Sequence, residues 1–383
     1  MNASPATRHP PRILVRSTNW LGDAVMSTPA LLRLREKFPD AHIALLAPEK
    51  LRELWTNHPA VNEIISFRVG EGLFSVAKKL RAGKFDLALV LPNSPRSAME
   101  VWWAGIPQRL DCARTWRNFF LIKTIPTRPG HAQMHKRSVA EIRRLISGTG
   151  FQPVSSPALT GWKPVPLSTA HQIHEYLHLV AALGANPEPL PPQLFVTAEE
   201  VETAKKKFGL EKITGPILGL NPGAEYGPAK RWPVGRFIAA AKEIQQRTNC
   251  VWLIFGSKGD VEICNRIAGA ITPHASRLTP LNLAGKTSLR ELMSLLKTCR
   301  VLLTNDTGPM HVAAALGTPV VVPFGSTSPE LTGPGLPGDP RHRLLKSDAP
   351  CSPCFLRECP IDFRCMNGIS VERVVNAVLE FKL

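Results

Sequence analysis

The chain alternates short apolar runs with stretches whose apolar residues recur at helical spacing. In the first half the apolar runs are Arg12–Ser17, His42–Ala47, Glu63–Ser66 and Leu87–Leu91. A strand that is apolar along its whole length needs cover on both faces. This alternation therefore predicts a parallel sheet with helices on both sides.

The same alternation begins again in the second half. Its apolar runs are Ile217–Asn221, Cys250–Phe255, Val301–Asn305 and Pro319–Pro323. The helices expected between or after them cover Val234–Gln246, Asp260–Ile271, Ser288–Thr298 and Pro309–Leu316. We expect an α/β fold of two Rossmann-like domains, residues 1–188 and 189–383, that face each other across a cleft.

Three further segments concern the domain organisation. The Pro-rich stretch Asn186–Pro192 marks the expected hinge, and the final helix, Val371–Phe381, is expected to pack back across the first domain. GFQPV at 150–154 recurs imperfectly as GWKPV at 161–165. We interpret residues 147–168, which are rich in Pro, Ser and Thr, as a surface insertion without a catalytic role.

The composition limits the class of protein. The 383 residues are 44% hydrophobic, and no apolar run is long enough to cross a membrane. The N-terminus has no apolar segment typical of a signal peptide. We therefore expect a cytoplasmic protein, and four cysteines scattered singly agree with reduced, buried thiols.

The net charge of +17 requires an explanation. Nucleic acid, an anionic membrane surface and a phosphorylated substrate are the three candidates. No helix-turn-helix, zinc finger or RNP signature is present, so nucleic acid is not the expected partner. A nucleotide- or nucleic-acid-binding protein without catalysis remains the alternative from another class.

The first motif, Ser17–Pro29, follows the first expected strand and therefore lies where open parallel sheets bind ligands. It contains Gly22 but lacks the G-x-G-x-x-G of dinucleotide-binding proteins, which argues against a dehydrogenase. It places a carboxylate, Asp23, at the start of a helix. Asp23 is either a functional group or an acidic residue that stabilises the helix.

The second motif, Asn221–Pro233, also follows a strand. Gly223 and Gly227 permit close backbone approach, and Lys230 and Arg231 add two adjacent cations. Such a loop is suited to a diphosphate whose negative charge increases as it leaves. The alternative is a surface loop with solvated basic side chains.

The third motif, Thr304–Pro319, joins a strand to a helix through the turn Asp306–Gly308. Free N–H groups at the helix start, with the Thr307 hydroxyl, predict an anion site. His311 lies one turn further on. Alternatively, Asp306 caps the helix and His311 packs under the loop. Gly325–Thr327 follows the next strand and is expected to line the same cleft.

The fourth motif contains the cysteines Cys351, Cys354, Cys359 and Cys365. Four cysteines within so short a segment suit either a structural zinc ion or a cluster of reduced thiols. The spacing does not decide between these alternatives, and neither assigns the cysteines a catalytic role.

Together, RILVRSTNWLGDAVMSTPAL, NPGAEYGPAKRWP and LLTNDTGPMHVAAALGTPVVVPFG resemble the ADP-heptose:lipopolysaccharide heptosyltransferases, a family with the two-domain GT-B fold. The similarity extends over nearly the whole chain in order, excepting the N-terminal tail and the insertion. KRWP and the cysteine-rich segment 351–365 are most similar to heptosyltransferase II. The resemblance implies an acceptor-binding first domain and an ADP-heptose-binding second domain.

The resemblance also implies residue roles. Asp23 falls on the catalytic base and Lys230 on a lysine that contacts the donor phosphate. Asp306–Gly308 and His311 fall on the donor-binding loop, and either Asp260 or Glu262 on an acidic residue that contacts the adenosine ribose.

The implied reaction is an inverting transfer without metal or cofactor, from ADP-heptose to the lipopolysaccharide inner core. The expected acceptor is heptosyl-Kdo2-lipid A at the inner face of the inner membrane. The alternatives are heptosyltransferase I activity or transfer from another nucleotide sugar. Four arginines, at positions 96, 109, 114 and 117, either bind the anionic acceptor or are solvated.

Overall fold

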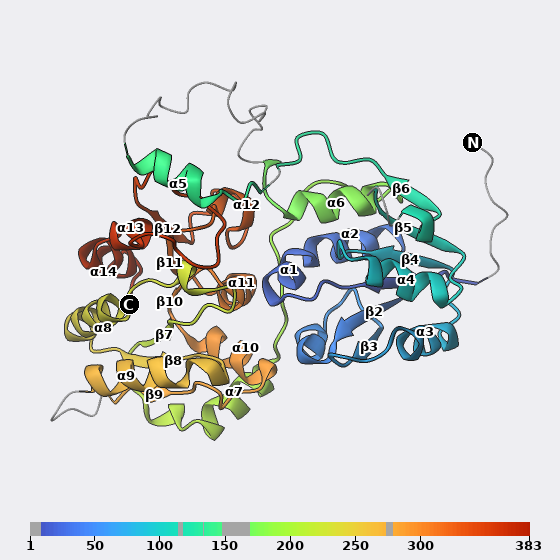
Figure 1. The fold of residues 1–383 in the computed structure, drawn as a ribbon. Coiled ribbons are helices and arrows are strands. Elements are labelled where there is room, and N and C mark those ends of the chain that lie inside the picture. The colour runs from blue at the N-terminus through green and yellow to red at the C-terminus, as the bar shows by residue number, and fades with distance from the viewer. Residues whose placement is uncertain (1–8, 114–117, 133, 148–168, 273–278) are drawn as a thin grey trace. The chain divides into compact units, whose positions relative to one another are not determined.

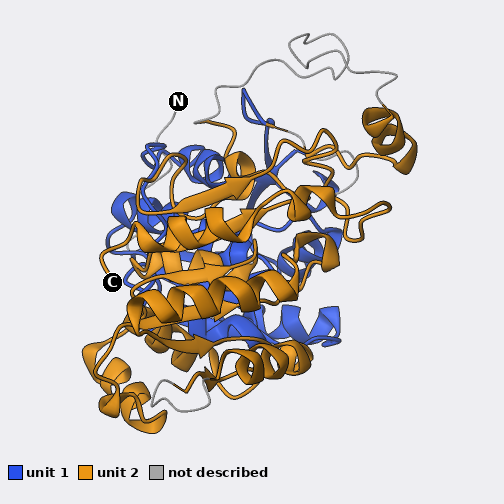
Figure 2. Ribbon diagram, turned by 90° about the vertical axis from the view of Figure 1, so that its left-hand side faces the viewer, with its two compact units in different colours: residues 1–131, 172–195 blue, residues 132–171, 196–383 orange. Residues whose placement is uncertain are grey.

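The computed structural model describes residues 9–113, 118–132, 134–147, 169–272 and 279–383. The chain forms two compact units, coloured separately in Figure 2: residues 1–131 with 172–195, and residues 132–171 with 196–383. The expected insertion lies almost entirely outside the described residues. No helix of the described parts is long and apolar enough to cross a membrane.

Unit 1 contains a six-stranded parallel sheet of order β3-β2-β1-β4-β5-β6 (Figure 1). Its strands are β1 Arg12–Arg16, β2 His42–Pro48, β3 Glu63–Phe67, β4 Leu87–Val90, β5 Gln108–Cys112 and β6 Lys123–Ile125. β1 lies in the middle and pairs with both β2 and β4. The first connecting loop therefore leaves the centre of the sheet at its carboxyl edge.

Helices cover both faces of this sheet. They are α1 Leu21–Met26, α2 Thr28–Lys37, α3 Leu73–Ala82, α4 Pro95–Trp103 and α6 Ile173–Ala181, with the short 3-10 helices η1 Glu49–Trp55 and η2 Asn118–Phe120. α3 packs against α4, and α2 packs against α6. Val76 and Leu80 of α3 are buried with Leu14 of β1 in one apolar cluster. Ile13, Leu14 and Val15 of β1 are fully buried, so both faces of the strand are covered there, as the apolar run predicts.

Unit 2 repeats this plan with a parallel sheet of order β12-β11-β10-β7-β8-β9. Its strands are β7 Ile217–Asn221, β8 Val251–Ile254, β9 Leu281–Asn282, β10 Leu302–Thr304, β11 Val320–Phe324 and β12 Arg343–Lys346. Its helices are α5 Val139–Ile146, α7 Ala198–Lys207, α8 Val234–Thr248, α9 Val261–Ile271, α10 Leu289–Thr298, α11 Gly308–Ala315, α12 Pro329–Thr332, α13 Arg364–Asn367 and α14 Val371–Leu379. The expectation of two α/β units with parallel sheets is confirmed.

The units do not divide at the single boundary expected after residue 188. α5 belongs to unit 2 because Ile142 packs with Cys351 and Cys354, and the Arg137 guanidinium donates to the Pro350 carbonyl. α6 belongs to unit 1, where it packs on α2. Spacing along the chain does not reveal these long-range contacts.

The expectation that the final helix packs across the first domain is wrong. α14 packs against α8, and its residues Val374, Val375 and Val378 are fully buried in the apolar core of unit 2. The apolar stripe of α14 was visible in the sequence, but its partner was not.

Four strands, β5, β6, β9 and β12, were not predicted from the apolar pattern. β6, β9 and β12 lie at sheet edges, and β5 lies next to an edge. Such strands are short or carry charges, as in the QRLDC sequence of β5. An edge strand is buried on only part of its surface, so its sequence lacks the continuous apolar run by which a central strand is recognised.

A buried ion pair connects β1 to α4 in unit 1. Arg16 Nε donates to Glu100 Oε2 over 2.9 Å, and the two side chains are only 2% and 0% exposed. The Arg16 guanidinium also donates to the Ser17 carbonyl and to Asn19 Oδ1, and it stacks over the Phe67 ring. Arg16 therefore fixes the loop that leads into α1. Burial lowers the pKa of Arg16, and Glu100 acts against this shift.

We predict that Glu100→Ala destabilises unit 1 by about 3–5 kcal/mol, because it leaves a buried guanidinium without its counter-charge. Glu36→Ala is the control, since Glu36 pairs with Arg33 on the surface and is 53% exposed. The control should cost at most about 1 kcal/mol. Urea unfolding measures both variants, and equal effects would show that the buried pair has no special role.

Candidate active site

In unit 1, Asp23 lies in the first turn of α1, just beyond the carboxyl end of β1. The N-cap position is occupied by Trp20, so Asp23 is not the capping residue. Gln172 Nε2 donates to Asp23 Oδ1 over 3.1 Å and to the Tyr176 hydroxyl over 2.9 Å. Gly22 precedes Asp23 within the same helical turn. The carboxylate is therefore held in one orientation by a residue from the far end of the unit's sequence.

Tyr176 is the buried partner of Gln172 beside Asp23. Its side chain is buried, and burial together with the Asp23 charge raises the Tyr176 pKa well above its ordinary value. The hydroxyl stays protonated, so Tyr176 supplies a neutral polar wall beside the carboxylate. Neither Gln172 nor Tyr176 belongs to the motif that contains Asp23, which explains why the sequence did not identify them.

In unit 2, three loops meet at the carboxyl ends of β7, β10 and β11. Asn305 connects the first two: its Oδ1 accepts the Trp232 backbone N–H over 2.9 Å, and its Nδ2 donates to the Pro222 carbonyl over 2.7 Å. Asn221 Nδ2 donates to Thr304 Oγ1. These contacts are buried, so they fix the loop from Asn221 to Pro233 against the turn at Asp306.

Lys230 is the central cation of this edge. Its Nζ lies 2.7 Å from Asp306 Oδ2, and the two side chains are 14% and 3% exposed. The Thr327 hydroxyl donates to the same carboxylate oxygen over 2.5 Å. The predicted second and third motifs, with Gly325–Thr327, are thus brought together within unit 2. The carboxylate fixes Lys230 and partly balances its charge.

Tyr226 supports Lys230 from another side. Lys230 Nζ lies 5.0 Å from the centre of the Tyr226 ring, and the Arg357 guanidinium lies 5.2 Å from it. Gly227 has a packing role in this loop. A Cβ atom at Gly227 would lie 2.4 Å from the Arg357 carbonyl oxygen, so the glycine permits close contact between two segments of unit 2.

Gly223 is similar. A Cβ atom there would lie 2.5 Å from a carboxylate oxygen of Asp260, so the space at this glycine is filled by Asp260. Asp260 also accepts hydrogen bonds from the Ser257 backbone and hydroxyl, and lies 3.6 Å from the Arg231 guanidinium. Glu262, by contrast, is exposed in the first turn of α9.

Two buried donors at this edge have no hydrogen-bond partner among the described residues. They are Arg231 Nε, from the second motif, and Ser326 Oγ, from the segment after β11. An orphaned buried donor has a cost, and an anionic ligand would remove it. Ser326 was predicted only as part of a segment, because the apolar pattern does not show which side chain of a loop points inward.

The turn after β10 leads into α11, whose N-cap is Thr307. No side chain caps this helix start, and Thr307 and Gly308 are half-buried. The first turn of the helix therefore leaves backbone N–H groups without a side-chain cap beside Lys230. His311 is 6% exposed, and burial lowers its pKa to about 4, with Asp306 acting against the shift. His311 is neutral at pH 7 and packs under the loop.

The four C-terminal cysteines are free thiols. Cys351 and Cys354 pack against Ile142, and burial raises the pKa of Cys365 to about 12. In the parts of the chain that the structure describes, no group of three or more His, Cys, Asp or Glu side chains is arranged to hold a metal ion.

The four candidate acceptor arginines divide into two groups. Arg96 pairs with Glu100 at 3.0 Å, and Arg109 donates to the carbonyl groups of Ile106 and Phe120. Both therefore support the fold of unit 1. The other two, Arg114 and Arg117, lie outside the described residues.

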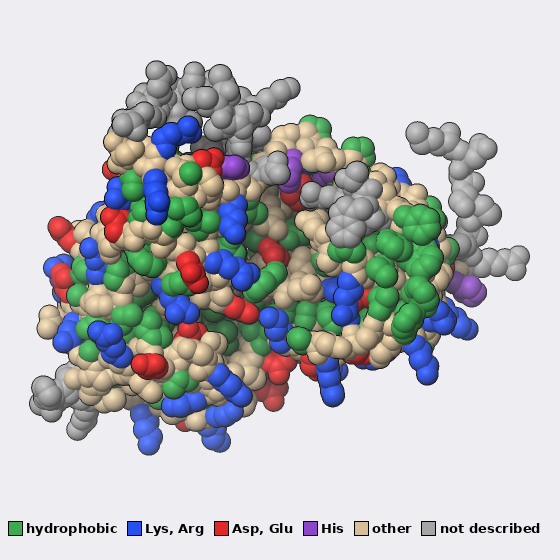
Figure 3. All heavy atoms as spheres, viewed as in Figure 1, with side chains coloured by type: hydrophobic (Ala, Val, Ile, Leu, Met, Phe, Trp, Pro, Cys, Tyr) green, Lys and Arg blue, Asp and Glu red, His purple; other side chains and the backbone are tan. Residues whose placement is uncertain are grey.

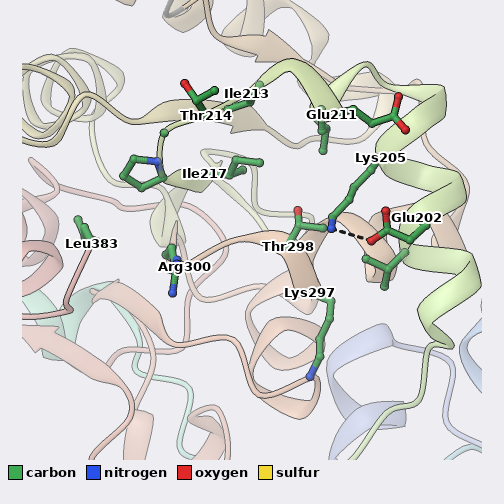
Figure 4. A pocket seen from close by; sticks show the side chains of 14 residues that line it. Glu202, Lys205, Glu211, Ile213, Thr214, Ile217, Lys297, Thr298, Arg300 and Leu383 are labelled. Carbon is green, nitrogen blue, oxygen red and sulfur yellow. Dashed lines mark hydrogen bonds and ion pairs between the residues drawn. The ribbon is translucent and has the colours of Figure 1, made fainter.

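An open pocket of about 700 Å³ lies at the opposite edge of the unit 2 sheet (Figure 4). It is lined by Ile217, at the start of β7, and by Thr298 and Arg300, which precede β10. Lys205 on its wall is paired with Glu202 at 2.8 Å. The pocket is thus separate from the cluster around Lys230, which lies at the carboxyl ends of the same strands.

Each doubly wound unit thus holds polar side chains at the carboxyl edge of its parallel sheet, where folds of this class bind ligands. The glycosyltransferase family 9 (heptosyltransferase) model matches residues 148–363, and the chain belongs to this family. It is a glycosyltransferase with a GT-B-type α/β fold.

Curated relatives agree with this assignment. The chain is 32% identical to lipooligosaccharide heptosyltransferase 2 of Haemophilus ducreyi, over 84% of this chain and 86% of the relative. It is also 32% identical to lipopolysaccharide heptosyltransferase 2 of Escherichia coli, over 84% and 85%. The solved structure of E. coli ADP-heptose LPS heptosyltransferase II has a TM-score of 0.74 and 29% identity, covering 96% of this chain and 98% of that one.

We predict that acid destabilises the protein partly through His311. Its pKa of about 4 in the folded state lies below the ordinary 6.5, so the unfolded chain takes up the proton first as pH falls. Stability should decrease by up to about 1.4 kcal/mol per pH unit between these two values, and be unaffected by this group above them. His311→Asn should remove the contribution of this side chain to the decrease of stability with falling pH.

The measurement is the thermal unfolding midpoint across this pH range. Buried His58 and His342, whose pKa values are also lowered to about 4, continue to contribute in both proteins. His9→Asn, at an exposed position, is the control. An unchanged slope in His311→Asn would contradict a neutral, buried His311.

Proposed function

We propose that this enzyme transfers heptose from ADP-heptose to the lipopolysaccharide inner core and adds the second heptose, onto heptosyl-Kdo2-lipid A. The observation that carries the proposal is Lys230, which Asp306 holds beside the start of α11, while Thr327 donates a hydrogen bond to Asp306. The names of the relatives, heptosyltransferase 2, support both the donor and the step.

The donor diphosphate interacts with unit 2 in this proposal. Lys230, Arg231 Nε and the backbone N–H groups of α11 donate to its oxygens, while Thr307 and Gly308 line the turn. Asp306 is a positioning residue, because a carboxylate would repel a diphosphate but orients the lysine. Fixed cations stabilise the charge that develops on the leaving ADP, which is the part a divalent metal plays in other transferases.

The acceptor hydroxyl reacts with the help of unit 1. Its oxygen attacks the anomeric carbon of the heptose, the bond from that carbon to the diphosphate oxygen breaks, and ADP leaves from the opposite face. Asp23 takes the hydroxyl proton. Gln172 orients Asp23 through its hydrogen bond, so that the carboxylate reaches the hydroxyl without rotating.

We assign the ribose contact to Asp260 and not to Glu262. Asp260 follows β8, the second strand of unit 2 along the chain. Its carboxylate lies against Gly223, which belongs to the loop that also carries Lys230 and Arg231. An acidic residue in this position binds ribose hydroxyls in related α/β folds. Glu262 lies two residues further on, in the first turn of α9, and is exposed.

The enzyme works at the inner face of the inner membrane in this proposal. Its acceptor is anchored by lipid A, and the net charge of +17 attracts the protein to an anionic leaflet.

The test of the proposed function is a transfer assay with purified enzyme. Kdo2-lipid A with its first heptose should accept heptose from ADP-heptose, and the same acceptor without that heptose should react far more slowly. Activity should persist with a chelator present. Preference for the unheptosylated acceptor would assign the first-heptose step instead, and faster transfer from ADP-glucose or a UDP-sugar would overturn the donor.

The two catalytic groups should fail in different ways. Asp23→Asn should slow transfer by roughly 100- to 10,000-fold while leaving ADP affinity nearly unchanged, because the base acts only on the acceptor. Lys230→Ala should weaken ADP binding and lower kcat/KM by a factor equivalent to about 2–4 kcal/mol. Titration calorimetry with ADP and steady-state kinetics measure the two effects.

Lys230→Ala leaves the buried Asp306 carboxylate unpaired, so a second variant is needed. Lys230→Met with Asp306→Asn keeps the site uncharged and should bind ADP equally poorly. Lys242→Ala on α8, an exposed lysine, is the charge-matched control. Normal ADP binding by the double variant would exclude Lys230 from the phosphate site, and full transfer by Asp23→Asn would exclude Asp23 as the base.

A further inference from the structure

Unit 1 carries an exposed aromatic patch that the catalytic groups do not use. It consists of apolar side chains from α3, α4 and the segment at η2: Phe74, Trp102, Trp103, Phe119, Phe120 and Ile122. Phe119 is 79% exposed, Ile122 65% and Phe74 62%. Figure 3 shows hydrophobic side chains gathered on the face over α3 and α4. Large apolar side chains grouped on a surface mark an interaction site.

The rings support one another, so the patch has a defined shape. Phe74 and Trp103 meet edge to face with their centres 4.7 Å apart, and Trp102 contacts Trp103 at 5.1 Å and Phe120 at 5.5 Å. Phe119 contacts Phe120 at 5.5 Å. These contacts connect two helices and a loop, yet they leave the outer ring faces open.

Basic side chains border the patch. Lys78 and Arg81 follow Phe74 on α3 by four and seven residues, so all three share one helix face. Arg81 donates to the Trp103 carbonyl over 2.7 Å, which places its charge beside the rings. Neither Lys78 nor Arg81 takes part in an ion pair of the described residues. The nearby carboxylate of Glu71 is only 14% exposed and is paired with Lys79.

We propose that this patch docks the enzyme on the surface of an anionic phospholipid membrane. Phe and Trp side chains insert at the depth of the lipid headgroups, while Lys78 and Arg81 interact with lipid phosphates. Aromatic side chains bordered by cations match an anionic membrane surface, where the rings meet the headgroup region and the cations meet phosphates. An apolar protein partner would give Lys78 and Arg81 no counter-charge. The inference rests on the proposed function, because the acceptor of that reaction is anchored in a membrane.

The experiment measures binding of the whole protein to vesicles of phosphatidylglycerol mixed with phosphatidylethanolamine. Phe74→Ser with Phe119→Ser should reduce the partition coefficient by about tenfold or more. Lys78→Glu should reduce it on these vesicles but not on vesicles of phosphatidylcholine. The controls are Val139→Ser with Val261→Ser, at exposed apolar positions of unit 2, and Lys242→Glu, which changes charge equally elsewhere.

Activity separates docking from the proposed reaction. The aromatic variant should lose transfer to acceptor embedded in vesicles but retain it on detergent-dispersed acceptor. Equal loss on both acceptors, or unchanged vesicle binding, would overturn the docking proposal. A wild-type dimer that the aromatic substitutions dissociate would also overturn it, since the patch would then bind a second copy. Absence of transfer by the wild type with normal vesicle binding would instead overturn the proposed function.

Discussion

The contact between Lys230 and Asp306 is the interaction on which the proposed chemistry of this enzyme depends. The Asp306 side chain is only 3% exposed, and its carboxylate is paired with Lys230 at 2.7 Å, so removal of either partner would leave a buried charge uncompensated. Thr327 donates to the same oxygen, and Asn305 fixes the loop that carries the lysine. The pair therefore fixes a cation beside the start of α11, where the proposed reaction would release an anionic leaving group.

In unit 1 a carboxylate, that of Asp23, is held in place in a similar way. Its buried Arg16–Glu100 pair fixes the loop before α1, and Gln172 then orients Asp23 within that helix. In each unit the side chain proposed to act in the reaction lies at the carboxyl edge of a parallel sheet, and a polar contact from a distant segment orients it. Preorganisation of this kind spares the reaction the cost of reorienting charges.

The glycines of the second motif have a packing role that the sequence did not predict. Gly223 and Gly227 were expected to let a diphosphate approach the backbone, but a Cβ atom at either position would meet Asp260 or Arg357. The two glycines let Asp260 and the Arg357 backbone pack closely against the loop that carries Lys230. His311 likewise lies under the loop as a neutral side chain, and burial is the main cause of its lowered pKa.

The sequence by itself determined the two α/β units, because strands buried on both faces require continuous apolar runs such as Ile13–Val15 and Leu302–Thr304. It also placed Asp23, Lys230 and Asp306 at strand ends, since chain order fixes which loop follows a strand. Only the tertiary structure decided that Gln172 meets Asp23, that Thr327 meets Asp306 and that α5 packs with Cys351. These partners are separated by many residues, and local spacing carries no information about contacts that form only when the sheets and helices have packed.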